Sequence, residues 1–212
     1  MKNLKFRILT VLFFLIVAIS GCAQEQSARE TIKLSKDWKF ILADNEAFKN
    51  AEFDDSGWRL LNVPHDWSIE GEFSTDNPAS PGGGALPGGI GWYRKKFKVA
   101  ETDKDKLIFI DFDGVYEKSE VWINGHFLGM RPYGYISFRY DLTPHLNFGG
   151  ENVLAVKVDN SVQPNSRWYS GSGIFRNVWL VKTGKVHVGQ WGTFITTPTV
   201  TTENAQVVIK TR

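Results

Sequence analysis

A histidine lies next to a carboxylate in the motif Val63-Pro64-His65-Asp66-Trp67. Such a pair could act as a general base and its orienting acid if a nucleophile were within reach. The motif contains no nucleophile, and a neighbouring His-Asp pair is weak evidence for a catalytic triad. The pattern therefore favours a turn after a strand, with Trp67 packed against the core.

Two glycine-rich segments are similar to known catalytic or binding loops only at first sight. Ser170-Gly171-Ser172-Gly173 lacks the spacing of a nucleophile turn and the strand that must precede one. Residues 78–91 lack the Gly-Lys-Ser/Thr ending of a phosphate-binding loop. Because Leu86 and Ile90 interrupt this second segment, we expect a long loop that lies over a neighbouring surface.

The segment Asn165-Ser166-Arg167-Trp168-Tyr169 suits the binding of a sugar. Trp168 and Tyr169 offer flat apolar faces with polar edges, and Arg167 offers a planar set of donors. The alternative is a loop folded back onto the core, which is as good an explanation of Trp168 taken alone. Arg167, Trp168 and Tyr169 are the candidate residues of a substrate rim.

Carboxylates provide no further candidate site. Hydrolysis of a glycosidic bond needs two carboxyl groups about 5 to 10 Å apart across a cleft. The spacing of the acidic residues singles out no such pair, so we predict no catalytic residue, no metal site and no cofactor in this chain.

These segments must be positioned by short strands, because the chain from Thr31 onward alternates β-prone runs with turn residues. Tyr93, Phe97 and Val99 alternate with Arg94, Lys96 and Lys98, which predicts a half-buried strand. Residues 107–112 are apolar except for Asp111, as in a central strand covered on both sides. Further strands are expected at residues 37–42, 136–142, 153–158 and 178–181.

The sharpest local signal is Asn124-Gly125 between residues 121–123 and 126–128. This dipeptide is typical of a type I′ turn, so a hairpin is expected there. Strands spread over about 150 residues without cysteine bridges predict an all-β, two-sheet sandwich of jelly-roll type.

The first 22 residues are a targeting segment rather than part of the fold. A basic head and an apolar run precede Ile19-Ser20-Gly21-Cys22, and the run is short for a membrane span of about 20 residues. An ordinary cleaved signal peptide or an uncleaved anchor is the alternative. Residues 23–30 are polar and are expected to form a tether to the folded part.

Charge and cysteine content exclude several classes of protein. The chain has 25 Lys and Arg against 23 Asp and Glu, and removal of Lys2, Lys5 and Arg7 with the leader leaves 22 against 23. This balance argues against a nucleic-acid partner. Cys22 is the single cysteine, so no disulfide can form within the chain.

A second series of β-prone residues begins at Gly184 and runs to Arg212. Only two or three strands fit there, whereas a β-sandwich domain needs about seven strands and roughly 100 residues. We therefore expect residues 184–212 to be the truncated start of another domain.

Several motifs together resemble the N-terminal sugar-binding domain of glycoside hydrolase family 2, the group of β-galactosidases, β-glucuronidases and β-mannosidases. The matching pieces are residues 63–67, Gly91-Trp92-Tyr93-Arg94, Val121-Trp122-Ile123-Asn124-Gly125 with Gly129, residues 138–143, residues 152–156 and Gly173-Ile174-Phe175-Arg176-Asn177-Val178. The resemblance covers residues 31–183. It implies a jelly-roll-like β-sandwich, and it makes the segment from Gly184 similar to the start of the family's immunoglobulin-like domain.

The resemblance also implies how the domain is used. The family's catalytic glutamates lie on a later (β/α)8 barrel, against which the sandwich packs and to whose active-site rim it lends loops. In some β-galactosidases of the family an aspartate shortly before the Gly-Ile-Phe-Arg element binds substrate and sodium, but this chain has Arg167-Trp168-Tyr169 there. Gly88 stands where another family member has an asparagine. We therefore do not assign the sodium site to this chain.

The sequence thus supports the hypothesis of a non-catalytic domain of a retaining, β-galactosidase-like enzyme, inactive without its catalytic barrel. Its expected partners are a β-glycoside at the rim of the complete enzyme, that barrel, and a membrane only through a lipid anchor. The end of the leader resembles a bacterial lipobox, which implies acylation of Cys22 and an exported lipoprotein in the periplasm or on the cell surface. A free-standing carbohydrate-binding or surface-interaction lipoprotein is the alternative. An interface-bearing domain should expose a large apolar patch, and a stand-alone binder a single aromatic groove.

Overall fold

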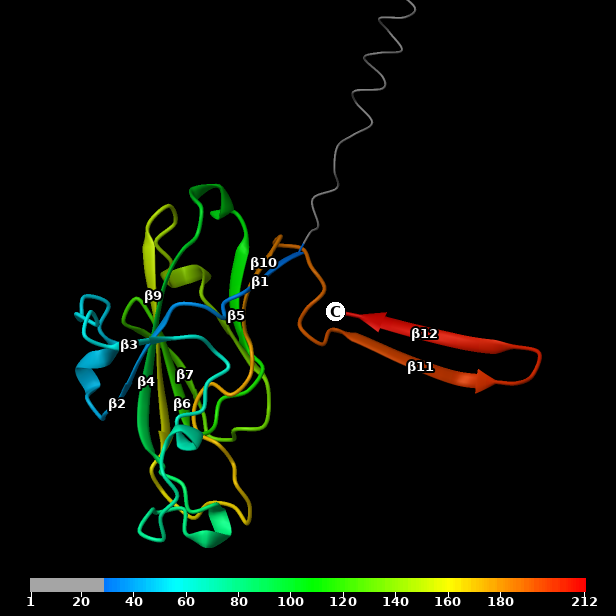
Figure 1. Cartoon of the computed structure of the whole chain (residues 1–212). Coiled ribbons are helices and arrows are strands. Elements are labelled where there is room, and N and C mark those ends of the chain that lie inside the picture. The colour runs from blue at the N-terminus through cyan, green and yellow to red at the C-terminus, as the bar shows by residue number, and fades with distance from the viewer. Residues whose placement is uncertain (1–28) are drawn as a thin grey trace, which may run out of the picture.

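Two antiparallel sheets pack face to face, and a separate two-stranded hairpin follows them (Figure 1). The computed structural model describes residues 29–212. The six-stranded sheet has the order β3 (Arg59–Leu61), β2 (Trp38–Leu42), β4 (Gly89–Lys98), β9 (Glu151–Asn160), β6 (Ser119–Ile123) and β7 (His126–Arg131). The four-stranded sheet has the order β1 (Arg29–Lys33), β10 (Val178–Thr183), β5 (Leu107–Phe112) and β8 (Phe138–Asp141). The predicted all-β sandwich is confirmed.

Short 3₁₀ turns connect the strands of the sandwich. They are η1 (Glu46–Lys49), η2 (Ser68–Glu70), η3 (Pro81–Gly83), η4 (Glu101–Asp103) and η5 (Thr143–His145). Among the residues that the structure describes, no helix has the length and apolar character to cross a membrane. The expected leader with Cys22 and the first part of the expected tether lie outside the described residues.

Strand β1 begins earlier than the sequence suggested. Arg29 and Glu30, the last two residues of the expected tether, pair with Thr183 and Lys182 of β10. The polar composition of 23–30 hid this pairing, because β1 is an edge strand whose side chains are largely exposed. The sheet therefore includes two residues that composition assigned to the tether.

The core lies between the two sheets and follows the alternation of the strands. Its fully buried members include Ile108, Ile110 and Phe112 from β5, and Tyr93, Ile123, Leu154 and Val156 from the larger sheet. The expectation that β5 is covered on both sides is wrong for its outer face. Phe109 and Asp111 point outward and are only partly buried, since β5 lies in an outer layer of the sandwich.

A second apolar cluster covers the outer face of the six-stranded sheet. Trp92 and Trp122 stack there with ring centroids 5.3 Å apart, and Phe48 and Trp58 from residues 43–58 pack over them. Arg94 lies beneath the same segment with 0% of its surface exposed, so its predicted place on a polar face is wrong. The alternation of β4 was predicted correctly, but the sequence of this strand does not show that residues 43–58 cover its outer face.

The hairpin predicted at Asn124-Gly125 is confirmed. The two residues have φ angles of 50° and 81°, and Ile123 pairs with His126 across the two-residue turn. The side chain of Asn124 also donates to the His145 carbonyl at 2.8 Å and accepts from the Val153 N–H at 2.8 Å. The turn is therefore tied to β9 as well as to its own strands.

The last two strands, β11 (Thr193–Val200) and β12 (Ala205–Thr211), form a hairpin that extends away from the sandwich (Figure 1). Its apolar side chains, such as Phe194 and Ile209, are exposed on the described chain. The assignment of residues 184–212 to an immunoglobulin-like domain stays a prediction.

Candidate functional site

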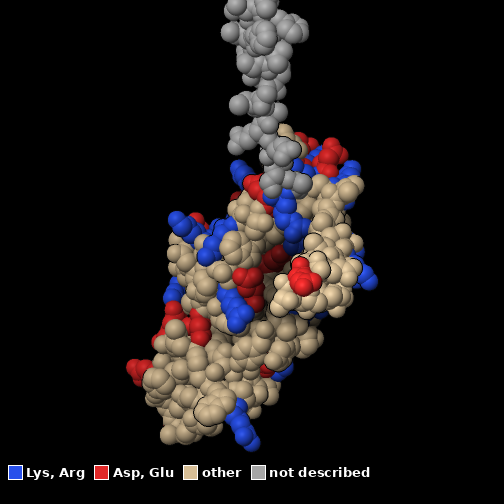
Figure 2. Space-filling view, turned by 90° about the vertical axis from the view of Figure 1, so that its right-hand side faces the viewer, with Lys and Arg blue, Asp and Glu red and all other residues tan. Residues whose placement is uncertain are grey.

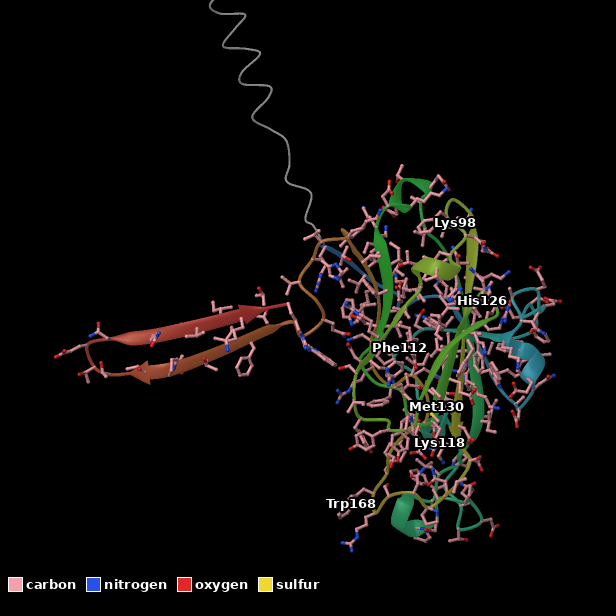
Figure 3. The ribbon with its side chains drawn as sticks, turned by 180° about the vertical axis from the view of Figure 1, so that it is seen from behind. Lys98, Phe112, Lys118, His126, Met130 and Trp168 are labelled. Carbon is pink, nitrogen blue, oxygen red and sulfur yellow. The ribbon has the colours of Figure 1, made fainter. Side chains whose placement is uncertain are left out.

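The predicted rim residues lie on a loop at one end of the sandwich, between β9 and β10 (Figure 3). Trp168 is at the tip of this end and is 79% exposed. The alternative in which the loop folds back and buries Trp168 in the core is therefore wrong. Arg167 is exposed beside it, while Tyr169 is less exposed because its ring turns back toward the protein.

Asp66 holds the rim loop in place. The Tyr169 hydroxyl donates to Asp66 Oδ2, and Asp66 Oδ1 accepts from the backbone N–H groups of Ser68 at 3.0 Å and Ser172 at 2.8 Å. Burial, and the hydrogen bond to the Asp66 carboxylate, raise the pKa of Tyr169. Gly171 has a φ of 75°, and a Cβ there would lie 2.7 Å from Asp66 Oδ2, so the close approach requires glycine. Asp66 thus closes the loop against the 63–68 turn.

The base of the loop is fixed by a second group of polar side chains. Asn165 donates to Glu117 at 3.0 Å and to Asn160 Oδ1 at 2.7 Å, and it accepts from the Tyr116 hydroxyl at 3.0 Å. Asn160 also donates to Ser172 Oγ at 2.7 Å. These amides are used within the protein, which leaves Arg167, Trp168 and the ring of Tyr169 as the groups that can meet a ligand.

Ser172 has a structural role, as its sequence context indicated. It is fully buried, and its hydroxyl lies 2.6 Å from that of Ser68. A hydroxyl engaged in this way inside the protein is not available for attack on a substrate.

The glycine-rich loop leans against the rim loop, as expected for a segment that covers a neighbouring surface. Gly84 has a φ of 95° and lies against the ring of Tyr169, and Leu86 is buried. Between the two loops the described residues leave a cavity of only about 10 Å³. This volume holds about one water molecule. A sugar bound at this end would therefore need a further wall from outside the described residues.

His65 is also structural. Its Nδ1 lies 2.7 Å from the hydroxyl of the buried Tyr93, and its Nε2 lies 3.3 Å from Glu70. Burial lowers the pKa of His65, although Glu70 opposes this effect. Two hydrogen bonds from Arg59 hold the pKa of Glu70 at about 2, so Glu70 is ionised at neutral pH and is no proton donor. Trp67 is buried in the core, as predicted.

An aromatic patch beside the rim loop was missed in the sequence. We define it as Tyr116, Tyr133, Tyr135 and Phe175, linked by ring-centroid distances of 5.2 to 6.2 Å. Tyr133 and Tyr135 are exposed, and the patch touches the rim loop through the hydrogen bond from Tyr116 to Asn165. The signal was Pro132-Tyr133-Gly134-Tyr135, two aromatic residues in a segment of turn composition.

Among the described residues, no group of three or more His, Cys, Asp or Glu side chains could hold a metal ion. This end of the molecule combines exposed aromatic rings with a rigid polar base. It can offer flat apolar faces and hydrogen bonds to a ligand, which is the chemistry of sugar recognition. We assign to the described residues no acid and nucleophile for a glycosidic bond.

The β-sandwich and its aromatic loop end define a carbohydrate-binding domain, and the comparisons with known proteins give its family. The family model described as "Glycosyl hydrolases family 2, sugar binding domain" matches residues 32–184, so the chain belongs to this family.

Two curated relatives illustrate the similarity. The chain is 58% identical to Beta-galactosidase BoGH2A of Bacteroides ovatus over 87% of this chain and 22% of that protein. It is 32% identical to a beta-glucuronidase of Formosa agariphila over 87% of this chain and 21% of the relative. The chain thus spans about a fifth of the length of the curated relatives it matches.

Solved structures show the same likeness. A beta-glycosidase from Bacteroides vulgatus matches with a TM-score of 0.79 and 45% identity, over 86% of this chain and 24% of that one. A family 2 member from Bacteroides cellulosilyticus matches with a TM-score of 0.81 and 38% identity, over 85% of this chain and 24% of that one. The family resemblance expected from the motifs is confirmed.

Proposed function

We propose that this chain serves as the non-catalytic sugar-binding domain of a β-glycosidase of the β-galactosidase type. The match of residues 32–184 to the family's sugar-binding domain carries the proposal. The 58% identity to a protein named as a beta-galactosidase supports the choice of substrate class. Hydrolysis in the whole enzyme would then depend on two carboxyl groups of a catalytic domain.

The exposed rim loop and the aromatic patch support a role shared with that domain. A cavity of about 10 Å³ cannot admit a sugar ring, whereas Trp168 and the patch present apolar surface to the outside. Exposed apolar surface next to a polar loop is typical of an interaction site. We infer that the catalytic domain packs beside the patch and completes a sugar site with Arg167, Trp168 and Tyr169.

Kinetics of the whole enzyme test the rim. Trp168→Ala should raise KM or lower kcat for aryl β-galactosides without changing the melting temperature, because Trp168 is exposed and contributes little to the core. Leu60→Ala is a control, since Leu60 is 60% exposed and lies on the edge strand β3 rather than on the loops beside the rim. Unchanged kinetics of Trp168→Ala would remove Trp168 from the substrate rim.

The chain by itself tests the non-catalytic assignment. We expect no release of nitrophenol from nitrophenyl β-galactoside, β-glucuronide or β-mannoside above a buffer blank. Reproducible turnover that is lost when one carboxylate of this chain is changed would refute the assignment. Tight binding of free galactosides without turnover would instead favour a self-sufficient binding module.

We further propose that the protein is exported and carries a lipid on Cys22. The basic head, the apolar run and Ile19-Ser20-Gly21-Cys22 support this proposal. Labelled palmitate fed to expressing bacteria should appear in the protein, and Cys22→Ala should abolish the label. Ser20→Ala keeps a small residue before the cysteine, so this variant should retain the label. Label that persists in Cys22→Ala would exclude acylation at this position.

A further inference from the structure

A cleft crosses the outer face of the four-stranded sheet, away from the rim loop. Its floor is formed by Trp179 of β10 and Asp111 of β5, with Arg139 of β8 beside them. Gln190 and Trp191, from the segment that leads to the hairpin, form the opposite wall. Figure 2 shows this face hollowed between the body of the sandwich and the hairpin, with acidic residues in the recess. The cleft encloses about 360 Å³, within the range of small-molecule sites.

Four charged side chains line this cleft, Arg29, Asp111, Asp113 and Arg139, and each is bonded within the protein. Arg29 donates to the Val188 carbonyl. Arg139 donates to both oxygens of Asp111 at 2.6 and 2.7 Å, and the Trp179 indole N–H donates to Asp113 at 2.9 Å. The Asp111 and Arg139 side chains are also mostly buried. An ionic ligand would have to compete with these pairs, so the floor favours a neutral ligand.

The remaining groups favour a ligand with many hydroxyls. Each carboxylate oxygen of Asp111 can accept a further hydrogen bond, and Gln190 can both donate and accept. Trp191 is 73% exposed on the described chain, where its indole ring is available to the apolar face of a ligand. Two acidic and two basic side chains that are already bonded, spare acceptors and an available indole ring together match a neutral sugar.

We propose that this cleft binds a neutral oligosaccharide, with Trp191 stacked on a sugar ring and Asp111 accepting from its hydroxyls. The choice of a sugar among neutral ligands rests on the proposed function, whereas the site itself rests on the cleft. The rim loop takes no part in it. No covalent bond is made or broken by this binding.

Nuclear magnetic resonance of the tryptophan indole N–H groups tests the proposal in the purified chain. Trp191→Phe assigns the Trp191 signal by its loss. Titration with lactose and cellobiose should shift the Trp179 and Trp191 signals and saturate. Trp191→Ala should weaken binding about two- to twelvefold, since one ring contact is worth about 0.5–1.5 kcal/mol. Trp191→Phe should keep most of the affinity because it keeps a flat ring.

Three results would overturn the proposal. One is that neither the Trp179 signal nor the Trp191 signal shows a saturable shift with lactose or with cellobiose. Another is an affinity that Trp191→Ala leaves unchanged but Trp168→Ala lowers, which would move the binding to the rim loop. The third is a shift caused by sodium sulfate and not by the sugars, which would make the cleft an anion site around Arg139. None of these results alters the kinetic test of Trp168, so the cleft and the proposed function can fail separately.

Discussion

Removal of the Arg94 guanidinium should destabilise the sandwich more than any surface substitution. Arg94 Nε donates to Asp55 at 2.8 Å, and its two terminal nitrogens donate to the carbonyls of Phe48, Asn50, Ala51 and Phe53 at 2.6 to 3.4 Å. All five N–H donors of the guanidinium thus have an acceptor. Arg94 therefore fastens residues 43–58 over Trp92 and Trp122.

The structure sets the size of the effect. Arg94→Met leaves the nearly buried Asp55 without a partner, and the loss of one member of a buried pair costs about 3–5 kcal/mol. Arg94→Lys keeps the charge but offers three donors in place of five, and the two lost bonds should cost about 1–3 kcal/mol. A domain with about 5–15 kcal/mol of stability would be brought close to unfolding by the Met variant.

Urea unfolding followed by tryptophan fluorescence measures these differences. Arg59→Met is the matched control, because Arg59 also donates two bonds to a carboxylate, that of Glu70, but at the surface. An exposed pair of this kind is worth at most about 1 kcal/mol. Arg94→Met combined with Asp55→Leu should regain part of the lost stability, since the unpaired charge is gone. Equal costs for Arg94→Met and Arg59→Met would refute the reasoning.

Three further substitutions test other parts of the structure. Gly125→Val should lower the free energy of unfolding by about 1–3 kcal/mol, because φ at Gly125 is 81°. A side chain at Gly57 also meets open space, so Gly57→Val should have little effect. Equal melting temperatures of the two variants would exclude the strained turn. The folded pKa of Glu70 is about 2, below its usual 4.5, so the stability from Glu70 is present above pH 4.5 and lost as the pH falls toward 2. Glu70→Gln should therefore flatten the plot of urea midpoint against pH in this range. An unaltered slope would contradict the Arg59 pairing. Asp66→Ala should speed amide hydrogen exchange in residues 165–172, and exchange equal to that of the unaltered chain would show that Asp66 does not hold the rim loop.

Much of the fold could be predicted because strand alternation and turn chemistry are local. Asn124-Gly125 requires only its own φ angles, and the alternation of Tyr93 and Phe97 with charged residues lies within a single strand, β4. Arg94 could not be predicted, since its burial depends on carbonyls 41 to 46 residues away. The outer face of β4 has the same sequence pattern whether a loop or water covers it.

The rim residues could be predicted because their composition is visible in the sequence. Trp168 and Tyr169 in a polar segment indicated a ligand-facing loop, and the structure places Trp168 at the exposed end. The contact that holds the loop was not visible, because Asp66 and Tyr169 are 103 residues apart. Asp66 was considered only as a partner of His65, whereas its own acceptors serve the loop.

The 63–67 turn couples the rim loop to the core. Trp67 is buried between the sheets and His65 is bonded to Tyr93, so the backbone of the turn is fixed from within. Asp66 projects from the same turn and bonds the rim loop at Tyr169 and Ser172. A change at Trp67 would therefore displace the loop without touching a ligand, whereas a change at Trp168 would remove a ligand contact without moving the turn. Substitutions of Trp67 and Trp168 should both change the kinetics, but only the substitution of Trp67 should also lower the stability of the domain.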